Sequence, residues 1–361
     1  MRVLAVVPST YDTSPGQRFR IEQWEPILRE GGVEITYAPF ETAELRSVLY
    51  QGGQVLKKVS AVTQNMRRRR DELANLDGYD LVYIFREAAI LGPPWFERKI
   101  ARSGVPYIFD FDDAVFVSYK SPSNGYLSYL KFPGKTADIC RLATHVMAGN
   151  QYLADYSRTY NDEVTIVPTT IDTDKYEFIE PDGEPNILTI GWSGSFSTVQ
   201  HLDTIREALQ DLAKDEKFRL RVIGTDKYDL PGVDVEAIAW RSETEIEDLS
   251  KMDIGLMPLP DENWSRGKCG LKALQYMALG KPSICSPVGV NSTIIKDGEN
   301  GYLSDGKQEW IEKLKLLMHS PELRRRIGRA GRETVEQHYS AKAIAPRVLE
   351  IFRVAGQNRE R

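Results

Sequence analysis

The stretch RGKCGLKALQYMALGKP, residues Arg266–Pro282, carries more information about the fold than any other part of the 361-residue chain. It predicts a basic loop that runs into a short helix, which a glycine ends and a proline separates from the next element. Lys272 lies near the predicted helix start, where backbone N–H groups and the helix dipole favour an anion. Because Arg266 and Lys268 add two cations just upstream, we interpret the stretch as a seat for a phosphate or diphosphate. A solvated basic turn is the alternative.

Two segments downstream continue the pattern: SPVGVN (Ser286–Asn291) and KDGENGYL (Lys296–Leu303). Together with LQYMALGKP they resemble, in order and spacing, the C-terminal half of retaining family-4 (group 1) glycosyltransferases. The resemblance implies a GT-B fold and transfer of a sugar from a nucleoside diphosphate sugar to a glycan, lipid-linked or other acceptor. It also implies retention of the anomeric configuration and no metal or other cofactor. Gly267 and Gln275 stand where the family has two glutamates, so the roles of those acids are not carried over, and Gln275 is kept as a donor-binding candidate.

Composition sets the broad class of the protein. The length suits two domains of ordinary size, and 41% hydrophobic with 10% aromatic residues suffices for two cores. A formal net charge of −5 argues against a general nucleic-acid binder. Three cysteines provide no disulfide framework, and the start MRVLAVVPST is followed by polar residues rather than a cleavage site. No apolar run reaches transmembrane length, so we expect a cytoplasmic protein.

Short apolar runs alternate with amphipathic helical stretches, which is typical of parallel α/β architecture. Helical patterns include Arg18–Glu30 and Gln54–Leu73. The strands predicted in the first half are Val3–Val7, Val33–Tyr37, Leu81–Phe85, Pro106–Asp110, His145–Ala148 and Val164–Val167. Those predicted in the second half are Ile187–Ile190, Arg219–Ile223, Val235–Ala239, Ile254–Met257 and Ser283–Cys285.

The segment Pro168–Asn186 separates the two series and is rich in Pro, Asp, Gly and Thr, which predicts a linker. We therefore expect an acceptor-side Rossmann-like domain at residues 1–170, a linker at 171–186 and a nucleotide-sugar-binding domain at 187–340. The resemblance implies that these two doubly wound domains face each other across a cleft. It also implies that a terminal helix, residues 341–361, crosses back to the first domain.

Three acids end or follow one predicted strand of the first half, in the sequence PYIFDFDD. Asp110, Asp112 and Asp113 allow three interpretations: an active-site acid, an Asp-x-Asp metal site, or a structural turn or helix cap. In the resembling family a histidine follows this strand and lies near the reacting sugar. We therefore name these acids as catalytic candidates together with Lys272, and assign no metal.

The first predicted βα loop, STYDTSPGQRFR (Ser9–Arg20), is a second candidate region. Gly16 allows close backbone approach, and Arg18 and Arg20 carry donors suited to phosphate or carboxylate. The corresponding family loop faces donor and acceptor. An ordinary loop with solvated arginines is the alternative.

The matching loop of the second half, GWSGSFSTVQHL, has a glycine and hydroxyl groups before a helix, which could hold a diphosphate. The candidates are Gly194, Ser195, Ser197 and Thr198. The family often has an Arg or Lys in this loop, so Lys268 or Lys272 is expected to supply the charge here.

Three more residues are expected at the donor site. Trp240 and Arg241 follow a strand at the position where the family holds the base, and Asn291 follows a glycine turn. Asn291 could equally be a turn residue.

A basic helical stretch suggests a membrane contact. Lys57, Lys58 and Arg67–Arg70 accompany apolar residues at helical spacing, so the helix could bind anionic lipid peripherally at the inner face of a membrane. Four adjacent arginines cover every face of a helix, so a solvated face beside the acceptor site stays an alternative.

Two rival functions share the same donor site. One is a GT-B sugar-nucleotide epimerase or hydrolase without an acceptor. The other is a catalytically inactive nucleotide-sugar-binding protein, suggested by the missing glutamate pair. The four histidines are scattered and lack zinc-ligand spacing, and no Walker loop is present.

Overall fold

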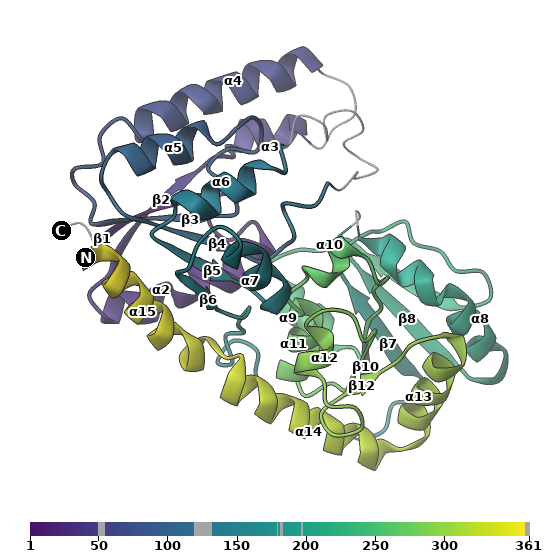
Figure 1. The fold of residues 1–361 in the computed structure, drawn as a ribbon. Helices are drawn as coiled ribbons and strands as arrows, with labels where there is room; N and C mark the ends of the chain where they lie inside the picture. Colours follow the sequence, from purple (N-terminus) through teal and green to yellow (C-terminus); the bar gives the residue numbers. More distant parts are fainter. Residues whose placement is uncertain (50–54, 119–131, 179, 181–182, 196–197, 358–361) are drawn as a thin grey trace. The chain divides into compact units, whose positions relative to one another are not determined.

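The computed structural model describes residues 1–49, 55–118, 132–178, 180, 183–195 and 198–357 (Figure 1). The chain divides into two compact units. The first comprises Met1–Thr169 and Ile344–Arg361, and the second comprises Thr170–Ala343.

The first unit contains a six-stranded parallel sheet of order β2-β1-β3-β4-β5-β6. Its strands are β1 (Arg2–Val7), β2 (Glu34–Pro39), β3 (Leu81–Phe85), β4 (Tyr107–Phe111), β5 (His145–Ala148) and β6 (Val164–Ile166). The helices are α1 (Pro15–Gln17), the π-helix η1 (Arg18–Glu22), α2 (Gln23–Glu30), α3 (Ala43–Leu49), α4 (Val55–Glu72), α5 (Trp95–Arg102), α6 (Lys135–Leu142) and α7 (Gln151–Arg158). Strands β3 and β4 are buried along their whole length, as the strands of a parallel sheet covered by helices must be.

The second unit contains another six-stranded parallel sheet, of order β12-β11-β10-β7-β8-β9. Its strands are β7 (Leu188–Ser193), β8 (Phe218–Ile223), β9 (Asp234–Ile238), β10 (Ile254–Met257), β11 (Ser283–Cys285) and β12 (Tyr302–Leu303). Its helices are the 3₁₀ helix η3 (Val199–Ile205), α8 (Arg206–Asp215), α9 (Glu245–Ser250), α10 (Asn263–Arg266), α11 (Leu271–Ala278), α12 (Asn291–Ile294), α13 (Lys307–His319) and α14 (Pro321–His338). The strand order reverses between β7 and β10, and ligands of such sheets bind beyond the carboxyl ends of the strands there.

The predicted parallel α/β architecture with two doubly wound domains is confirmed. The bounds predicted for β3, β5, β10 and β11 coincide with those in the structure, whereas the two-residue strand β12 was not predicted. The expected single helix Arg18–Glu30 is interrupted at Arg20, whose backbone has φ −120° and ψ −111°. The interruption accompanies an inward-pointing Arg20 side chain that is fully buried.

The segment expected to be a linker packs into the second unit up to Phe178. Ile171 pairs with Ser340, and the Arg332 guanidinium donates to the Thr173 carbonyl oxygen at 3.0 Å. The Phe178 ring lies so close to Gly280 that a Cβ there would be 2.2 Å from it. This part of the chain is therefore held by side chains rather than left as a free connection.

The C-terminal helix α15 (Ala341–Gln357), drawn in yellow in Figure 1, completes the first unit. Leu349 packs against Gly31, and the Phe352 ring centre lies 5.8 Å from that of Tyr83 on β3. Arg353 donates to the Gly31 carbonyl oxygen at 3.0 Å. The last helix of the chain thus covers the core built around its first strands.

Candidate functional site

A glycine turn lies at the carboxyl ends of β7 and β8. The Gly194 N–H donates to the Ile223 carbonyl oxygen at 2.9 Å, and a Cβ at position 194 would lie 2.3 Å from the Trp192 ring. Gly224 has φ +128°, and a Cβ there would lie 2.2 Å from the Gly194 carbonyl oxygen. Only glycine fits at both positions, because the Trp192 ring and the Gly194 carbonyl oxygen occupy the place of a side chain.

Two side chains close the turn that follows. The Ser195 N–H donates to Thr198 Oγ1 at 3.1 Å, and the two hydroxyl oxygens lie 3.2 Å apart. The turn leads directly into η3. Ser197, also predicted for this loop, lies outside the described residues.

Lys272 reaches this turn from the start of α11. Its Nζ lies 5.4 Å from the centre of the Trp192 ring, which itself faces Gly194. Lys268 lies one loop earlier, with Nζ 4.9 Å from the centre of the Trp264 ring. Gly270, with φ +73°, turns the chain into α11, whose N-terminal end carries the positive end of the helix dipole.

His201 on η3 joins the same cluster. It is 3% exposed, and within the part of the chain that the structure describes neither ring nitrogen has a hydrogen-bond partner. Burial, and after it the charges of Lys272 and Lys268, lower the pKa of His201 to about 4. Sequence analysis missed this residue because it tested the histidines only for zinc spacing.

Two predicted donor-site residues, Trp240 and Gln275, are tied together by two that were not predicted. Trp240 Nε1 donates to Glu245 Oε1 at 2.8 Å. The Tyr176 hydroxyl donates to Glu245 Oε2 at 2.9 Å and accepts from Gln275 Nε2 at 2.9 Å. Gln275, in the position of the family's second glutamate, is thus buried in a network that contains a carboxylate from α9. No motif marks Tyr176 or Glu245 in the sequence.

The remaining donor-site candidates behave differently. Arg241 is exposed, and Arg266 pairs with Asp261, with Nε and Oδ1 2.7 Å apart. Asn291 is fully buried and donates from Nδ2 to the Ser286 carbonyl oxygen at 3.0 Å. The Asn291 side chain thus takes part in the turn, which the sequence offered as the alternative to a ligand contact.

In the first unit, Asp110 and Arg20 form a fully buried ion pair. Arg20 Nε donates to Asp110 Oδ2 at 2.9 Å, and the Tyr83 hydroxyl donates to the same oxygen. The Arg20 guanidinium also lies 4.9 Å from the centre of the Trp24 ring. Both predictions are corrected by this placement: Asp110 and Arg20 are interior groups that a substrate cannot reach.

Asp112 and Asp113 instead meet an arginine that sequence analysis missed. Arg86 follows β3 with φ +60°, which is uncommon for a residue other than glycine. Its Nε lies 2.7 Å from Asp112 Oδ1, and its Nη2 lies 2.8 Å from Asp113 Oδ2. A Cβ on Gly16 would lie 2.7 Å from Arg86 Nη2, so glycine at that position admits the guanidinium. We call Gly16, Arg86, Asp112 and Asp113 the Arg86 cluster.

The other predicted arginine of the first loop, Arg18, is partly buried and pairs with Asp12, with Nε and Oδ1 2.8 Å apart. Within the described residues, no group of three His, Cys, Asp or Glu side chains has the arrangement needed to hold a metal ion. Asp113 forms an ion pair with Arg86 and is not part of a metal-holding group among the described residues.

Comparison with known proteins finds a similarity in the second unit. Residues 172–334 match the family model described as glycosyl transferases group 1. Spore coat protein SA of Bacillus subtilis is 30% identical over 81 residues, 22% of this chain and 22% of that protein. Trehalose synthase of Pyrococcus horikoshii is 32% identical over 87 residues, 24% of this chain and 21% of that protein. The chain thus spans about a fifth of the length of the curated relatives that it matches.

Solved structures are similar over both units. Sucrose-phosphate synthase from Thermosynechococcus elongatus has a TM-score of 0.70 at 15% identity, over 98% of this chain and 99% of that one. A glycosyltransferase from Rickettsia africae has 0.66 at 15% identity, over 98% of each chain. Anabaena HepE in complex with UDP-glucose has 0.66 at 14% identity, over 98% of this chain and 100% of that one. The likeness shows a GT-B fold.

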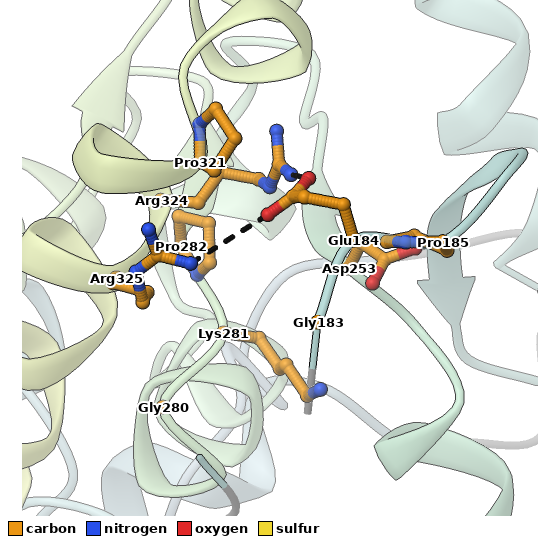
Figure 2. Close-up of a pocket in the computed structure, with 10 residues that line it drawn as sticks. All are labelled: Gly183, Glu184, Pro185, Asp253, Gly280, Lys281, Pro282, Pro321, Arg324 and Arg325. Carbon is orange, nitrogen blue, oxygen red and sulfur yellow. Dashed lines mark hydrogen bonds and ion pairs between the residues drawn. The ribbon is translucent and has the colours of Figure 1, made fainter. Parts of the chain in front are cut away.

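A cavity of about 240 Å³ lies elsewhere in the second unit (Figure 2). Pro185, Asp253 and Pro282, which line it, stand just before β7, β10 and β11, at the amino ends of the strands. Glu184 pairs with Arg324 and Arg325 across it. The cavity is therefore on the opposite edge of the sheet from Lys272 and the Gly194 turn.

The basic helix α4, in the first unit, is less uniformly basic at its surface than its sequence suggests. Arg69 is fully buried and donates to the carbonyl oxygens of Ala38 at 2.7 Å and Ala88 at 3.0 Å, and Arg68 donates to that of Phe40 at 2.9 Å. These two arginines are thus removed from the predicted membrane-facing set. Among the described helices, none is long and apolar enough to cross a membrane.

Proposed function

We propose that this protein is a retaining glycosyltransferase that moves a sugar from a nucleoside diphosphate sugar to a glycan, lipid-linked or other acceptor without a metal cofactor. The observation that carries the proposal is the approach of Lys272 to the Gly194 turn, at the carboxyl edge of the sheet in the unit that matches the group 1 glycosyltransferase model. The UDP-glucose complex of the similarly folded HepE supports a nucleoside diphosphate sugar as the donor class.

In this proposal the second unit acts on the leaving group. As the bond between the anomeric carbon and the phosphate oxygen breaks, its electron pair passes to the diphosphate. Lys272, Lys268 and the N-terminal end of α11 stabilise the negative charge that develops there.

The first unit acts on the acceptor through the Arg86 cluster. The acceptor oxygen bonds to the anomeric carbon on the face that the diphosphate leaves, and its proton passes to a phosphate oxygen of the departing diphosphate. Asp112 orients the acceptor hydroxyl by accepting a hydrogen bond, and Arg86 holds Asp112 through the 2.7 Å contact. The basic residues Lys57, Lys58, Arg67 and Arg70 would add a peripheral contact with an anionic membrane if the acceptor is lipid-linked.

Replacing Lys272 tests the donor site. Lys272→Ala should lower kcat by about 100-fold or more, because a charge that stabilises the transition state is lost. Lys217→Ala, an exposed lysine at the amino end of β8, is the matched control and should leave turnover unchanged. The measurement is release of nucleoside diphosphate from a donor found by screening. Near-normal turnover of Lys272→Ala would remove this lysine from the site.

Excess chelator should leave turnover unchanged, because the proposed stabilisation of the diphosphate comes from lysines and a helix end. Loss of activity with chelator, restored by Mn²⁺ or Mg²⁺, would contradict this. The same assay without acceptor separates the rivals: diphosphate release or epimer formation alone indicates a hydrolase or epimerase. Nucleotide binding without turnover of any donor indicates an inactive binding protein.

A further inference from the structure

We infer that His201 donates a hydrogen bond to the diphosphate of the bound donor, as a third group beside Lys272 and Lys268. The inference rests on the proposed function, because it concerns the same donor site. It assigns a direct substrate contact to a residue that carries no motif.

The first support is an unmade hydrogen bond. His201 is 3% exposed, yet neither Nδ1 nor Nε2 has a hydrogen-bond partner among the described residues. A buried polar group without a partner costs about 1–3 kcal/mol. Such a cost is common where a ligand supplies the missing partner, since functional sites often contain groups that the fold leaves unsatisfied.

The second support is position. The His201 N–H donates to the Thr198 carbonyl oxygen at 3.0 Å, so its backbone is bound to the turn that closes on Ser195. That turn directly follows Gly194, whose neighbour Trp192 faces Lys272. The imidazole thus belongs to the short segment that also forms the proposed phosphate seat.

The third support is charge. The imidazole is held in its neutral form by burial and by the fields of Lys272 and Lys268, which lower its pKa to about 4. The positive charges of Lys272 and Lys268 repel a cation and attract an anion, so the partner of the neutral His201 N–H is expected to be an anionic oxygen. Hydrogen bonds to charged acceptors are shorter and stronger than neutral ones, so a phosphate oxygen is the best partner available to this ring.

A histidine that only packs in the core and a histidine that binds phosphate should affect the affinities for different molecules. Titration with molecules that have or lack a diphosphate therefore separates the two roles. Wild-type protein, His201→Phe, His201→Gln and His201→Asn are titrated with UDP, with uridine and with inorganic pyrophosphate. His201→Phe should bind UDP and pyrophosphate about 10- to 100-fold more weakly, the effect of one hydrogen bond to a charged group, and uridine equally well. The amide of either Gln or Asn should restore most of the loss, and the one that does identifies the donating ring nitrogen.

Unchanged binding of UDP and pyrophosphate by His201→Phe would overturn the inference and leave the donor site intact. An equal loss for uridine and UDP would also overturn it, because that result indicates packing. If wild-type protein binds neither pyrophosphate nor any of UDP, GDP and ADP, the proposed function itself fails.

A measurement on the unmutated chain covers the case in which His201→Phe does not fold. Pyrophosphate added to protein labelled with ¹⁵N-histidine should shift the ring nitrogen resonances of His201, assigned with His201→Gln. The resonances of His319, an exposed partner of Glu216 in the same unit, are the internal control and should not move. Unmoved His201 resonances at saturating pyrophosphate would overturn the inference.

Discussion

Two aspartates that stand two positions apart have opposite environments. Asp110 lies inside the first unit with Arg20 and Tyr83, whereas Asp112 is 9% exposed and held by Arg86. The difference follows from what each carboxylate meets beyond the strand. Arg20 comes from the π-helix η1 and pairs with the first aspartate, while Arg86, in a left-handed backbone conformation, reaches the second. The first carboxylate is fully buried, and the second keeps a small exposed fraction.

Substituting each aspartate should therefore give opposite results. Asp110→Asn leaves Arg20 buried without its counter-charge and should lower the free energy of unfolding by about 3–5 kcal/mol. Asp112→Asn should cost less than about 1 kcal/mol but should lower kcat with little change in nucleoside diphosphate affinity. Chemical denaturation gives the first quantity, and steady-state kinetics with a binding titration gives the second.

Equal stability of the two variants would show that the Arg20–Asp110 pair is dispensable. Unchanged turnover of Asp112→Asn would show that the Arg86 cluster is structural. The acceptor-side groups of the first unit would then have to be sought elsewhere.

At the scale of elements, neighbouring arginines of helix α4 have different environments. Arg69 points inward and donates to three carbonyl oxygens. They belong to Val7 in β1, Ala38 in β2 and Ala88, which follows β3. Burial lowers the pKa of Arg69 to about 10, so it keeps its charge at neutral pH. Arg67, two residues earlier, is exposed. The helix is thus attached to the sheet by hydrogen bonds as well as by apolar packing.

Arg69→Met should lower the free energy of unfolding by about 3 kcal/mol or more, because several buried carbonyl groups lose their donor at once. Arg67→Met on the same helix is the matched control and should change it by less than about 0.5 kcal/mol. Urea denaturation followed by circular dichroism measures both. Similar stabilities would mean that water replaces the guanidinium.

At the scale of the whole molecule, each unit is built on a parallel sheet with its own core. The first unit contains residues from both ends of the sequence. The final residues, Ile344–Arg361, belong to the unit that starts at Met1. Phe352 is fully buried beside Tyr83, and Leu349 covers Gly31. The first unit therefore depends on contacts between the two ends of the sequence.

Phe352→Ala should destabilise the first unit by about 3–5 kcal/mol, since a large buried ring is removed and a cavity is left. Val354→Ala, at a position 50% exposed on the same helix, should cost less than about 1 kcal/mol. Calorimetry of the full chain measures both. A wild-type transition for Phe352→Ala would show that α15 is not required by the first unit.

The sequence by itself determined the elements and the fold class. Short continuous apolar runs and period-3.6 apolar patterns are local properties, so the bounds of β3, β5, β10 and β11 could be predicted residue by residue. Lys272 at the start of α11 and Gly194 after β7 could be predicted as well, because helix starts and tight turns have local signals.

Only the tertiary structure decided which polar residues are structural and which can meet a ligand. Arg20 and Asp110 pair across 90 positions of sequence, Gln275 and Tyr176 across 99, and His201 has two lysines of another loop and helix near it. Burial and partners at these distances depend on how the chain packs. Neighbouring residues share almost the same local signal, so position along the chain cannot separate Asp110 from Asp112 or Arg69 from Arg67. The physical reason is that the free energy of a charged side chain is set by its solvation and counter-charges, which are properties of the packed molecule.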